Sequence, residues 1–108
     1  MDFELVYASE LDTMLKRSRG ILIDIRSRQE YQKEHWPGAV NYCYEDIESG
    51  RIRLPANRKL VLYCDHGGGS MQLARNLGKE GYHVVTVVGG YEAMKKFKEN
   101  YFKNRRNV

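Results

Sequence analysis

The chain has 108 residues, of which 42% are hydrophobic, and a formal net charge of +4. This size fits a single domain over residues 1–108 with its own core, and the composition excludes a disordered or fibrous chain. No apolar stretch is long enough to cross a bilayer and the amino terminus lacks a secretory signal, so we expect a cytoplasmic protein.

The amino-terminal part predicts two strands joined by a helix. Residues 3–7 alternate apolar and polar side chains well enough for a short strand. Ser9 is suited to begin a helix that Gly20 ends. Residues 21–26 form an apolar run that is typical of a second, buried strand.

A capping motif opens the next element. Ser27 is followed three residues later by Glu30, which is the pattern of a capping box, and we expect a helix that carries Tyr31 and His35. The Pro37-Gly38 pair ends this helix because proline and glycine disfavour its continuation.

Residues 39–42 predict a brief strand, and residues 45–47 predict a single helical turn that Gly50 ends. The run 60–63 is continuously apolar, which favours a strand buried on both faces of a parallel sheet. It ends at Cys64.

Beyond Cys64, the glycines 67–69 lead into a helix that Gly81 ends. Its inward positions are predicted from helical spacing as Met71, Ala74 and Leu77. Residues 83–88 are rich in β-branched side chains and predict a fifth strand, which Gly89-Gly90 separates from a last helix over about 91–102. Alternating strands and helices predict an α/β fold of three layers with a mainly parallel sheet and right-handed crossovers.

Cys64 is the candidate reactive residue, since open α/β sheets bind ligands at the carboxyl ends of strands. The glycines 67–69 can turn their N–H groups into one concavity, and the following helix adds positive charge at its amino end. We expect these groups to favour a thiolate or persulfide anion, although the charge of Asp65 opposes this unless it points to solvent. The alternative is a merely packed cysteine, which needs no glycine run.

Other residues carry weaker signals. Cys43 is interpreted as a packing residue, with a redox role as the alternative, because a cytosolic chain with two cysteines does not predict a disulfide. No metal site is predicted, since the histidines and cysteines lack the close pair spacings of metal ligands.

The carboxyl-terminal residues are rich in positive charge: Lys95, Lys96, Lys98, Lys103, Arg105 and Arg106. Nucleic acid is the alternative partner here, but no recognised binding motif accompanies the charges. We favour a helix whose Met94, Phe97 and Tyr101 pack inward and whose lysines suit the helix dipole.

Three separated segments resemble the signatures of rhodanese domains. Residues 22–26, Glu30-Tyr31 and residues 35–41 are similar to the amino-terminal signature. Residues 64–70 resemble the active-site loop, and residues 88–93 resemble the carboxyl-terminal signature. The resemblance is closest to the small single-domain sulfurtransferases, covers nearly the whole chain, and implies a rhodanese-like three-layer fold with a five-stranded sheet.

The resemblance implies a sulfurtransferase in which Cys64 takes a sulfane sulfur from a donor such as thiosulfate and becomes a persulfide. The sulfur then passes to a thiol or to cyanide, with no cofactor beyond the covalent persulfide. By the family pattern, the substrate-binding amides come from Asp65, His66, Gly67, Gly68, Gly69 and Ser70. Ser70 is also expected to cap the following helix.

Asp24 and Arg26 match the family's Asp-x-Arg element and are expected behind the loop. For Arg26 we favour an ion pair with Glu30 over steering of anions. His35 and Trp36 are expected to position the adjoining turn. His66 either contacts substrate or is simply solvated.

The sequence also departs from the family pattern. Many family loops carry basic or hydroxyl side chains at the positions of Asp65 and Gly69, so a persulfide on a partner protein is a candidate donor beside thiosulfate. A cysteine phosphatase needs an arginine six residues after its cysteine, where this chain has Ser70. The remaining alternative is a non-catalytic module that carries sulfur to a partner protein or regulates it.

Overall fold

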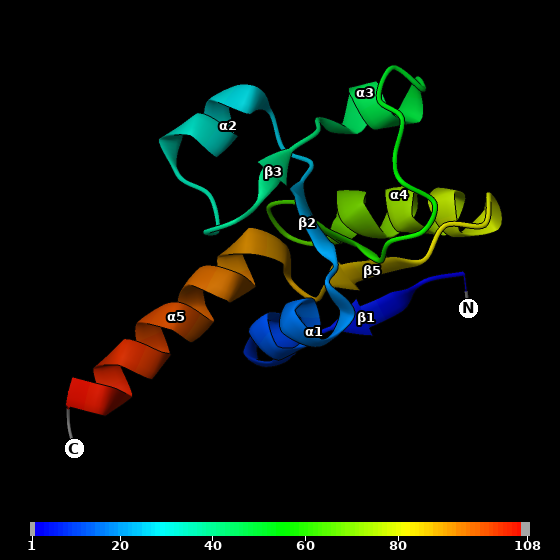
Figure 1. The fold of residues 1–108 in the computed structure, drawn as a ribbon. Coiled ribbons are helices and arrows are strands. Elements are labelled where there is room, and N and C mark those ends of the chain that lie inside the picture. The colour runs from blue at the N-terminus through cyan, green and yellow to red at the C-terminus, as the bar shows by residue number, and fades with distance from the viewer. Residues whose placement is uncertain (1, 107–108) are drawn as a thin grey trace.

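The computed structural model describes residues 2–106, with the side chains of residues 2–103. Strands and helices alternate along the chain (Figure 1). The elements are β1 (Glu4–Val6), the 3-10 helix η1 (Ala8–Glu10), α1 (Leu11–Ser18), β2 (Ile21–Asp24), α2 (Arg28–Lys33), β3 (Val40–Asn41), α3 (Tyr44–Glu48), β4 (Leu60–Tyr63), α4 (Gly68–Lys79), β5 (Val84–Val87) and α5 (Gly90–Arg106).

The five strands form one sheet in the order β1-β5-β4-β2-β3, and every pair in it is parallel. In the central strand β4, Leu60 lies opposite Ile21 on one side and Val84 on the other. The prediction of a mainly parallel five-stranded α/β sheet is confirmed. Because the strands are parallel, their carboxyl ends meet at one edge of the sheet.

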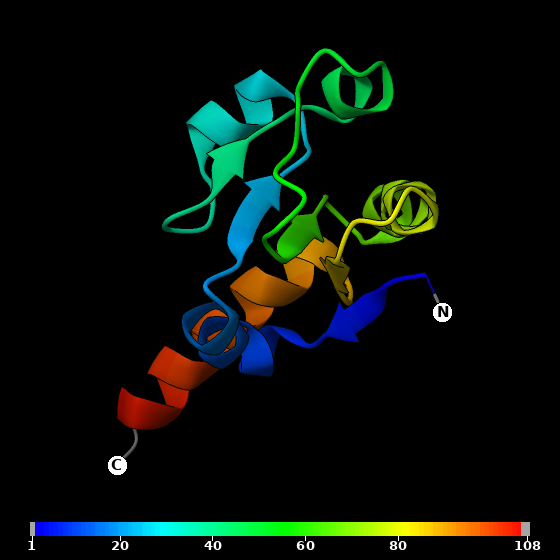
Figure 2. The ribbon, with the colours of Figure 1, turned by 45° about the vertical axis from the view of Figure 1, so that its right-hand side comes forward.

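Side chains of β4 alternate between two cores, one on each face of the sheet. Leu60 and Leu62 pack with residues of α3 and α4, whereas Val61 and Tyr63 pack with residues of α1 and α5. Helices therefore cover both faces, and the sheet is the middle of three layers (Figure 2). Burial of β4 on both faces explains its continuous apolar sequence.

Several predicted helix boundaries are confirmed, and others are wrong. Ser9 does not begin α1, because it lies inside η1 and α1 begins at Leu11. The Ser27–Glu30 capping box is formed, and Gly81 has a positive φ directly after Glu80, the C-cap of α4. The left-handed residue after α1 is Arg19 (φ 53°) rather than Gly20. His35 lies outside α2, because the helix ends at Lys33 and the chain then becomes extended.

The inward faces of two helices also differ from the predictions. In α4, Leu73 is buried whereas Met71 is 39% exposed. In α5, Met94 is fully buried, but Phe97 and Tyr101 are exposed because the helix extends past the sheet (Figure 1). These exposed aromatic rings do not contribute to the core.

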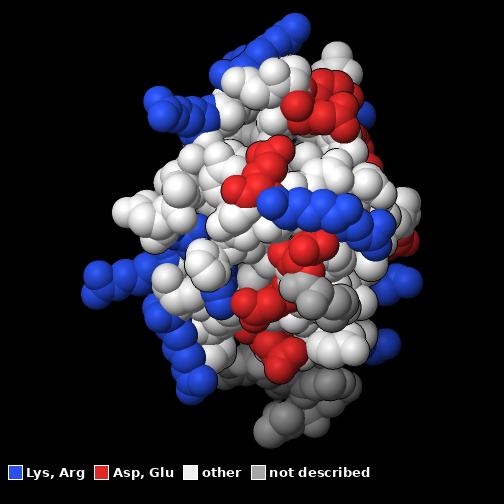
Figure 3. Space-filling view, turned by 90° about the vertical axis from the view of Figure 1, so that its right-hand side faces the viewer, with Lys and Arg blue, Asp and Glu red and all other residues white. Residues whose placement is uncertain are grey.

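Charges of both signs alternate over the face seen in Figure 3, where a column of acidic side chains runs between lysines and arginines. The side chains of Arg105 and Arg106 lie outside the described part. None of the helices in residues 2–106 is both long and apolar enough to cross a membrane.

Candidate active site

The candidate site lies where three parallel strands end. Cys64 follows β4, Asp24 ends the neighbouring β2, and Gly89-Gly90 follow β5 on the other side. Residues that are far apart in sequence therefore meet around one half-buried thiol.

Two main-chain amides point at the sulfur. The Gly67 amide donates to Cys64 Sγ over 3.0 Å and the Ser70 amide over 3.4 Å. Gly67 is left-handed (φ 102°) and precedes α4, while Gly68 and Gly69 belong to the first turn of that helix. The cradle therefore combines one left-handed residue with a helix amino terminus, rather than three glycines in a loop. Both features favour a negative charge on sulfur.

Ser70 does not cap the helix, because it lies inside α4 and the N-cap is Gly67. Its hydroxyl is fully buried, donates to the Gly67 carbonyl over 3.2 Å and shares a 2.5 Å hydrogen bond with Thr86 on β5. The Cys64 thiol in turn donates to Ser70 Oγ over 3.6 Å. The side chain thus fixes the first turn of α4 against the sheet.

The segment after β5 holds the other side of the loop. The Tyr91 amide donates to the Cys64 carbonyl over 2.7 Å, and the Glu92 amide donates to the Asp65 carbonyl over 3.1 Å. Gly90 has a positive φ of 64°, and a Cβ there would lie 2.5 Å from the Cys64 carbonyl oxygen. Sequence reasoning placed these residues in a signature but did not identify this contact.

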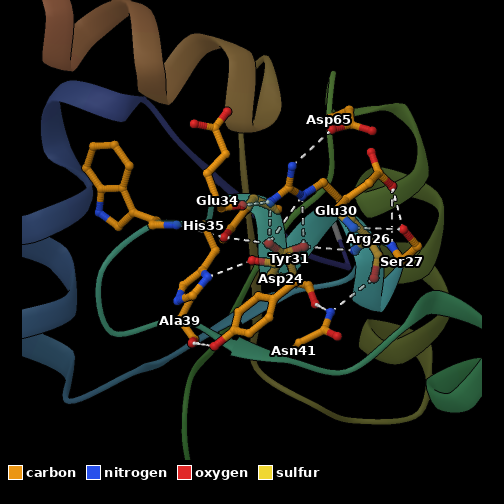
Figure 4. A network of polar contacts seen from close by, with 12 residues as sticks. Asp24, Arg26, Ser27, Glu30, Tyr31, Glu34, His35, Ala39, Asn41 and Asp65 are labelled. Carbon is orange, nitrogen blue, oxygen red and sulfur yellow. Dashed lines mark hydrogen bonds and ion pairs between the residues drawn. The ribbon is translucent and has the colours of Figure 1, made fainter.

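Behind the loop, Asp24 and Arg26 form a buried ion pair (Figure 4). Arg26 Nη2 donates to Asp24 Oδ2 over 2.8 Å, and the Tyr63 hydroxyl donates to the same oxygen over 2.7 Å. Arg26 also donates to the Glu34 carbonyl, and its guanidinium lies 4.3 Å from the centre of the Tyr91 ring. This network joins β2, β4 and α5 directly beneath the loop.

The expected ion pair between Arg26 and Glu30 is not formed. Arg26 precedes α2 and turns back to Asp24, while its Nη1 reaches Asp65 Oδ1 over 3.4 Å. Glu30 instead forms the capping box: its carboxylate accepts from the Ser27 amide, and its amide donates to the Ser27 hydroxyl. Steering of anions by Arg26 also has little support, because its side chain is only 6% exposed.

Electrostatics agree with this geometry. Burial alone lowers the pKa of Arg26, but the hydrogen bonds and charge of Asp24 outweigh it and raise the pKa above its ordinary value. Desolvation, followed by the hydrogen bond and charge of Glu30, raises the pKa of Asp65. The hydrogen bond to Asp65 conversely lowers the pKa of Glu30.

The outer surface of the loop is bordered by further ion pairs. His66 Nδ1 lies 2.8 Å from Glu92 Oε2, and Lys95 Nζ lies 3.0 Å from Glu34 Oε1. A hollow of about 150 Å³ beside the loop is lined by Arg26, Asp65, His66, Tyr91, Glu92 and Lys95. The His66 side chain is 79% exposed and contacts Glu92.

The residues around the turn after α2 contact one another as expected for framework residues. His35 stacks on Tyr31, and the Trp36 amide donates to the Tyr63 hydroxyl over 3.1 Å. Cys43 is a half-buried free thiol near Asn41. Among the described residues, no group of three or more potential ligands is arranged to hold a metal ion.

Comparisons with known proteins agree with the resemblance. The sequence profile of the rhodanese-like domain matches residues 7–97. The chain is 37% identical over 84 residues to a tRNA sulfurtransferase of Desulfurococcus amylolyticus, covering 78% of this chain but only 16% of that protein. It is 24% identical over 83 residues to a thiosulfate sulfurtransferase of Coxiella burnetii, covering 76% of this chain and 78% of that one.

Solved structures give the same result. A rhodanese homolog from the bacterium Thermus thermophilus superposes with a TM-score of 0.70 at 30% identity, covering 83% of this chain and 99% of that one. The strand order, the Cys64 loop and the profile match together show that the chain belongs to the family of rhodanese-like domains.

Proposed function

We propose that the protein is a sulfurtransferase that moves a sulfane sulfur to a thiol or cyanide acceptor through a persulfide on Cys64. The observation that carries this proposal is the placement of Cys64 Sγ within hydrogen-bond distance of the Gly67 and Ser70 amides at the amino end of α4. Such donors stabilise an anionic sulfur and remain in place as charge moves to the outer sulfur of a persulfide. The sulfurtransferase names of two relatives support the same reaction class.

The proposed reaction consists of two displacement steps at sulfur. In the first, the Cys64 thiolate attacks the outer sulfur of the donor, forms a sulfur–sulfur bond and releases sulfite when the donor is thiosulfate. In the second, a thiol or cyanide attacks the outer sulfur of the persulfide and returns Cys64 as thiolate. The sulfane sulfur keeps its oxidation state, so no external oxidant or reductant is needed.

A sulfur-transfer assay with thiosulfate or an alkyl persulfide as donor, and with cyanide as acceptor, tests this proposal. We expect thiocyanate to form with the wild-type chain and with Cys43→Ser, and none above background with Cys64→Ser. Equal activity in Cys64→Ser, or no transfer from either donor, would overturn it. Turnover of an aryl phosphate that depends on Cys64 would instead indicate a phosphatase, despite the absence of an arginine at Ser70.

A further inference from the structure

Thr86 places a hydroxyl group inside an otherwise apolar strand. The other residues of β5 are Val84, Val85 and Val87, and all four positions are buried. Thr86 pairs with Leu62 of β4, so its side chain lies on the face of the sheet that α4 covers. A valine has nearly the same shape and no polar group, so burial of a hydroxyl at this position requires a hydrogen-bond partner.

Ser70 in the first turn of α4 is that partner. The two hydroxyl oxygens lie 2.5 Å apart, and both residues are fully buried. Within the part of the chain whose side chains the structure describes, the Thr86 hydroxyl bonds to Ser70 alone. If Thr86 accepted from Ser70, its own hydrogen would be buried without an acceptor, which is unfavourable. Thr86 is therefore the donor and Ser70 the acceptor.

The Ser70 hydrogen then has two acceptors to choose from. Ser70 Oγ lies 3.2 Å from the Gly67 carbonyl oxygen and 3.6 Å from Cys64 Sγ. The Gly67 carbonyl also accepts from the Met71 amide over 3.1 Å, so it keeps a partner when the Ser70 hydrogen turns away. A Cys64 thiol donates to Ser70 while Ser70 donates to Gly67, and a thiolate can receive the Ser70 hydrogen instead. Every one of these groups has a partner in both states.

We propose that Thr86 is a positioning residue for the nucleophile of the proposed sulfurtransferase reaction. By donating to Ser70, it keeps the Ser70 hydrogen available to the sulfur when Cys64 loses its proton to water. The hydroxyl then joins the Gly67 and Ser70 amides as a third donor to the anionic sulfur. The hydrogen bond from Thr86 also polarises the Ser70 hydroxyl, which makes it a stronger donor.

Other titratable groups near the thiol are unchanged when only these two hydroxyls are altered. Asp65 follows Cys64 in the chain, and its carboxylate contacts Arg26. The first turn of α4 carries no acidic residue. The tyrosines that pack against the same core as Cys64 are Tyr42, Tyr44 and Tyr82. A change in the pH dependence of Cys64 can therefore be assigned to the hydroxyl pair.

The rate of Cys64 alkylation by iodoacetamide, measured against pH in the Cys43→Ser chain, tests the proposal. The midpoint of this profile follows the fraction of thiolate, whereas its plateau follows the reactivity of the thiolate itself. We expect Ser70→Ala to raise the midpoint by about one pH unit, a tenfold lower thiolate fraction below the midpoint. Thr86→Val should raise it by about 0.5 pH unit, which is about threefold.

Two further comparisons separate a positioning role from a structural one. Thr86→Ser and Thr86→Ala both lack the γ-methyl group, but only Thr86→Ser keeps the hydroxyl, so we expect it to retain the wild-type midpoint while Thr86→Ala shifts like Thr86→Val. Because Thr86 acts through Ser70, adding Thr86→Val to Ser70→Ala should move the midpoint no further. Urea unfolding of each variant shows that the measured chains are folded.

An unchanged midpoint in Thr86→Val, or in Thr86→Ala if Thr86→Val does not fold, would overturn the inference. A further shift in the double variant, or equal shifts in Thr86→Ser and Thr86→Ala, would do so too. Alkylation requires neither a sulfur donor nor an acceptor, so each of these results leaves the sulfurtransferase function standing. Failure of Cys64 to take up sulfur from any donor would contradict that function instead, and the two failures are distinguishable.

Discussion

The ion pair between Asp24 and Arg26 gives the sharpest prediction of stability. Asp24 is fully buried, and four hydrogen bonds from the Arg26 side chain and amide converge on its carboxylate together with the Tyr63 hydroxyl. Asp24→Asn keeps the shape of the side chain but leaves a buried guanidinium with only Asp65 as a charged partner. Removing one member of a buried pair costs about 3–5 kcal/mol.

Because Arg26 keeps its contact with Asp65, we expect Asp24→Asn to lose unfolding free energy at the lower end of this range, about 3 kcal/mol. For a domain of this size each kcal/mol lowers the midpoint of thermal unfolding by about 4 °C, so we expect a decrease of about 12 °C. Urea unfolding of Asp24→Asn, Arg26→Met and the double variant measures the pair. The double variant should lose less stability than the sum of the single variants, since it leaves no uncompensated buried charge.

The control is Asp46→Asn, which removes a surface ion pair with Arg51 over 3.5 Å and should change the unfolding free energy by less than about 0.5 kcal/mol. A loss of under about 1 kcal/mol in Asp24→Asn would refute the argument that this pair fastens β2 beneath the loop.

Three further changes test individual contacts around the thiol. Gly90→Ala should lower the free energy of unfolding by more than about 2 kcal/mol and abolish sulfur transfer. The new Cβ would meet the Cys64 carbonyl, and the φ of this residue is positive. Thermal unfolding measures the first effect and the thiocyanate assay the second. Tyr63→Phe should cost about 1–2 kcal/mol in urea unfolding through the lost hydrogen bond to Asp24, and wild-type stability would contradict this. Ser70→Ala should lower the free energy of unfolding by about 1–3 kcal/mol, because it leaves the Thr86 hydroxyl unpaired. Cys64 should still accept sulfur from its donor, since the Ser70 amide remains. A folded variant in which Cys64 no longer accepts sulfur would show that the hydroxyl is required.

The five strands and the position of Cys64 were predictable from local patterns. An apolar run that ends at a cysteine and is followed by glycines specifies strand, loop and helix without knowledge of tertiary contacts. The capping box of α2 was equally local, because Ser27 and Glu30 satisfy each other's backbone groups.

Predictions that depended on tertiary context were less successful. Spacing suggested an ion pair between Arg26 and Glu30, but that spacing brings side chains together only inside a helix, and α2 begins at Arg28. Helical periodicity alone also did not determine which face of α4 points inward: Ala74 and Leu77 are buried as predicted, but Leu73 is buried and Met71 is exposed.

The contacts of Gly90 and Tyr91 with Cys64 join segments that are separated by more than twenty residues. The sequence shows a glycine pair after the last strand but not what this pair contacts. The pairing of β4 with β5 places it against the backbone that follows β4, and the absence of side chains allows this close approach.

The intact mass of the protein after incubation with a sulfane-sulfur donor and removal of excess donor tests the central proposal most directly. We predict that the wild-type chain and Cys43→Ser each gain one sulfur atom, that Cys64→Ser gains none, and that cyanide removes the added sulfur. A gain that persists in Cys64→Ser, or no gain in the wild-type chain with thiosulfate or with cysteamine persulfide, would contradict the account.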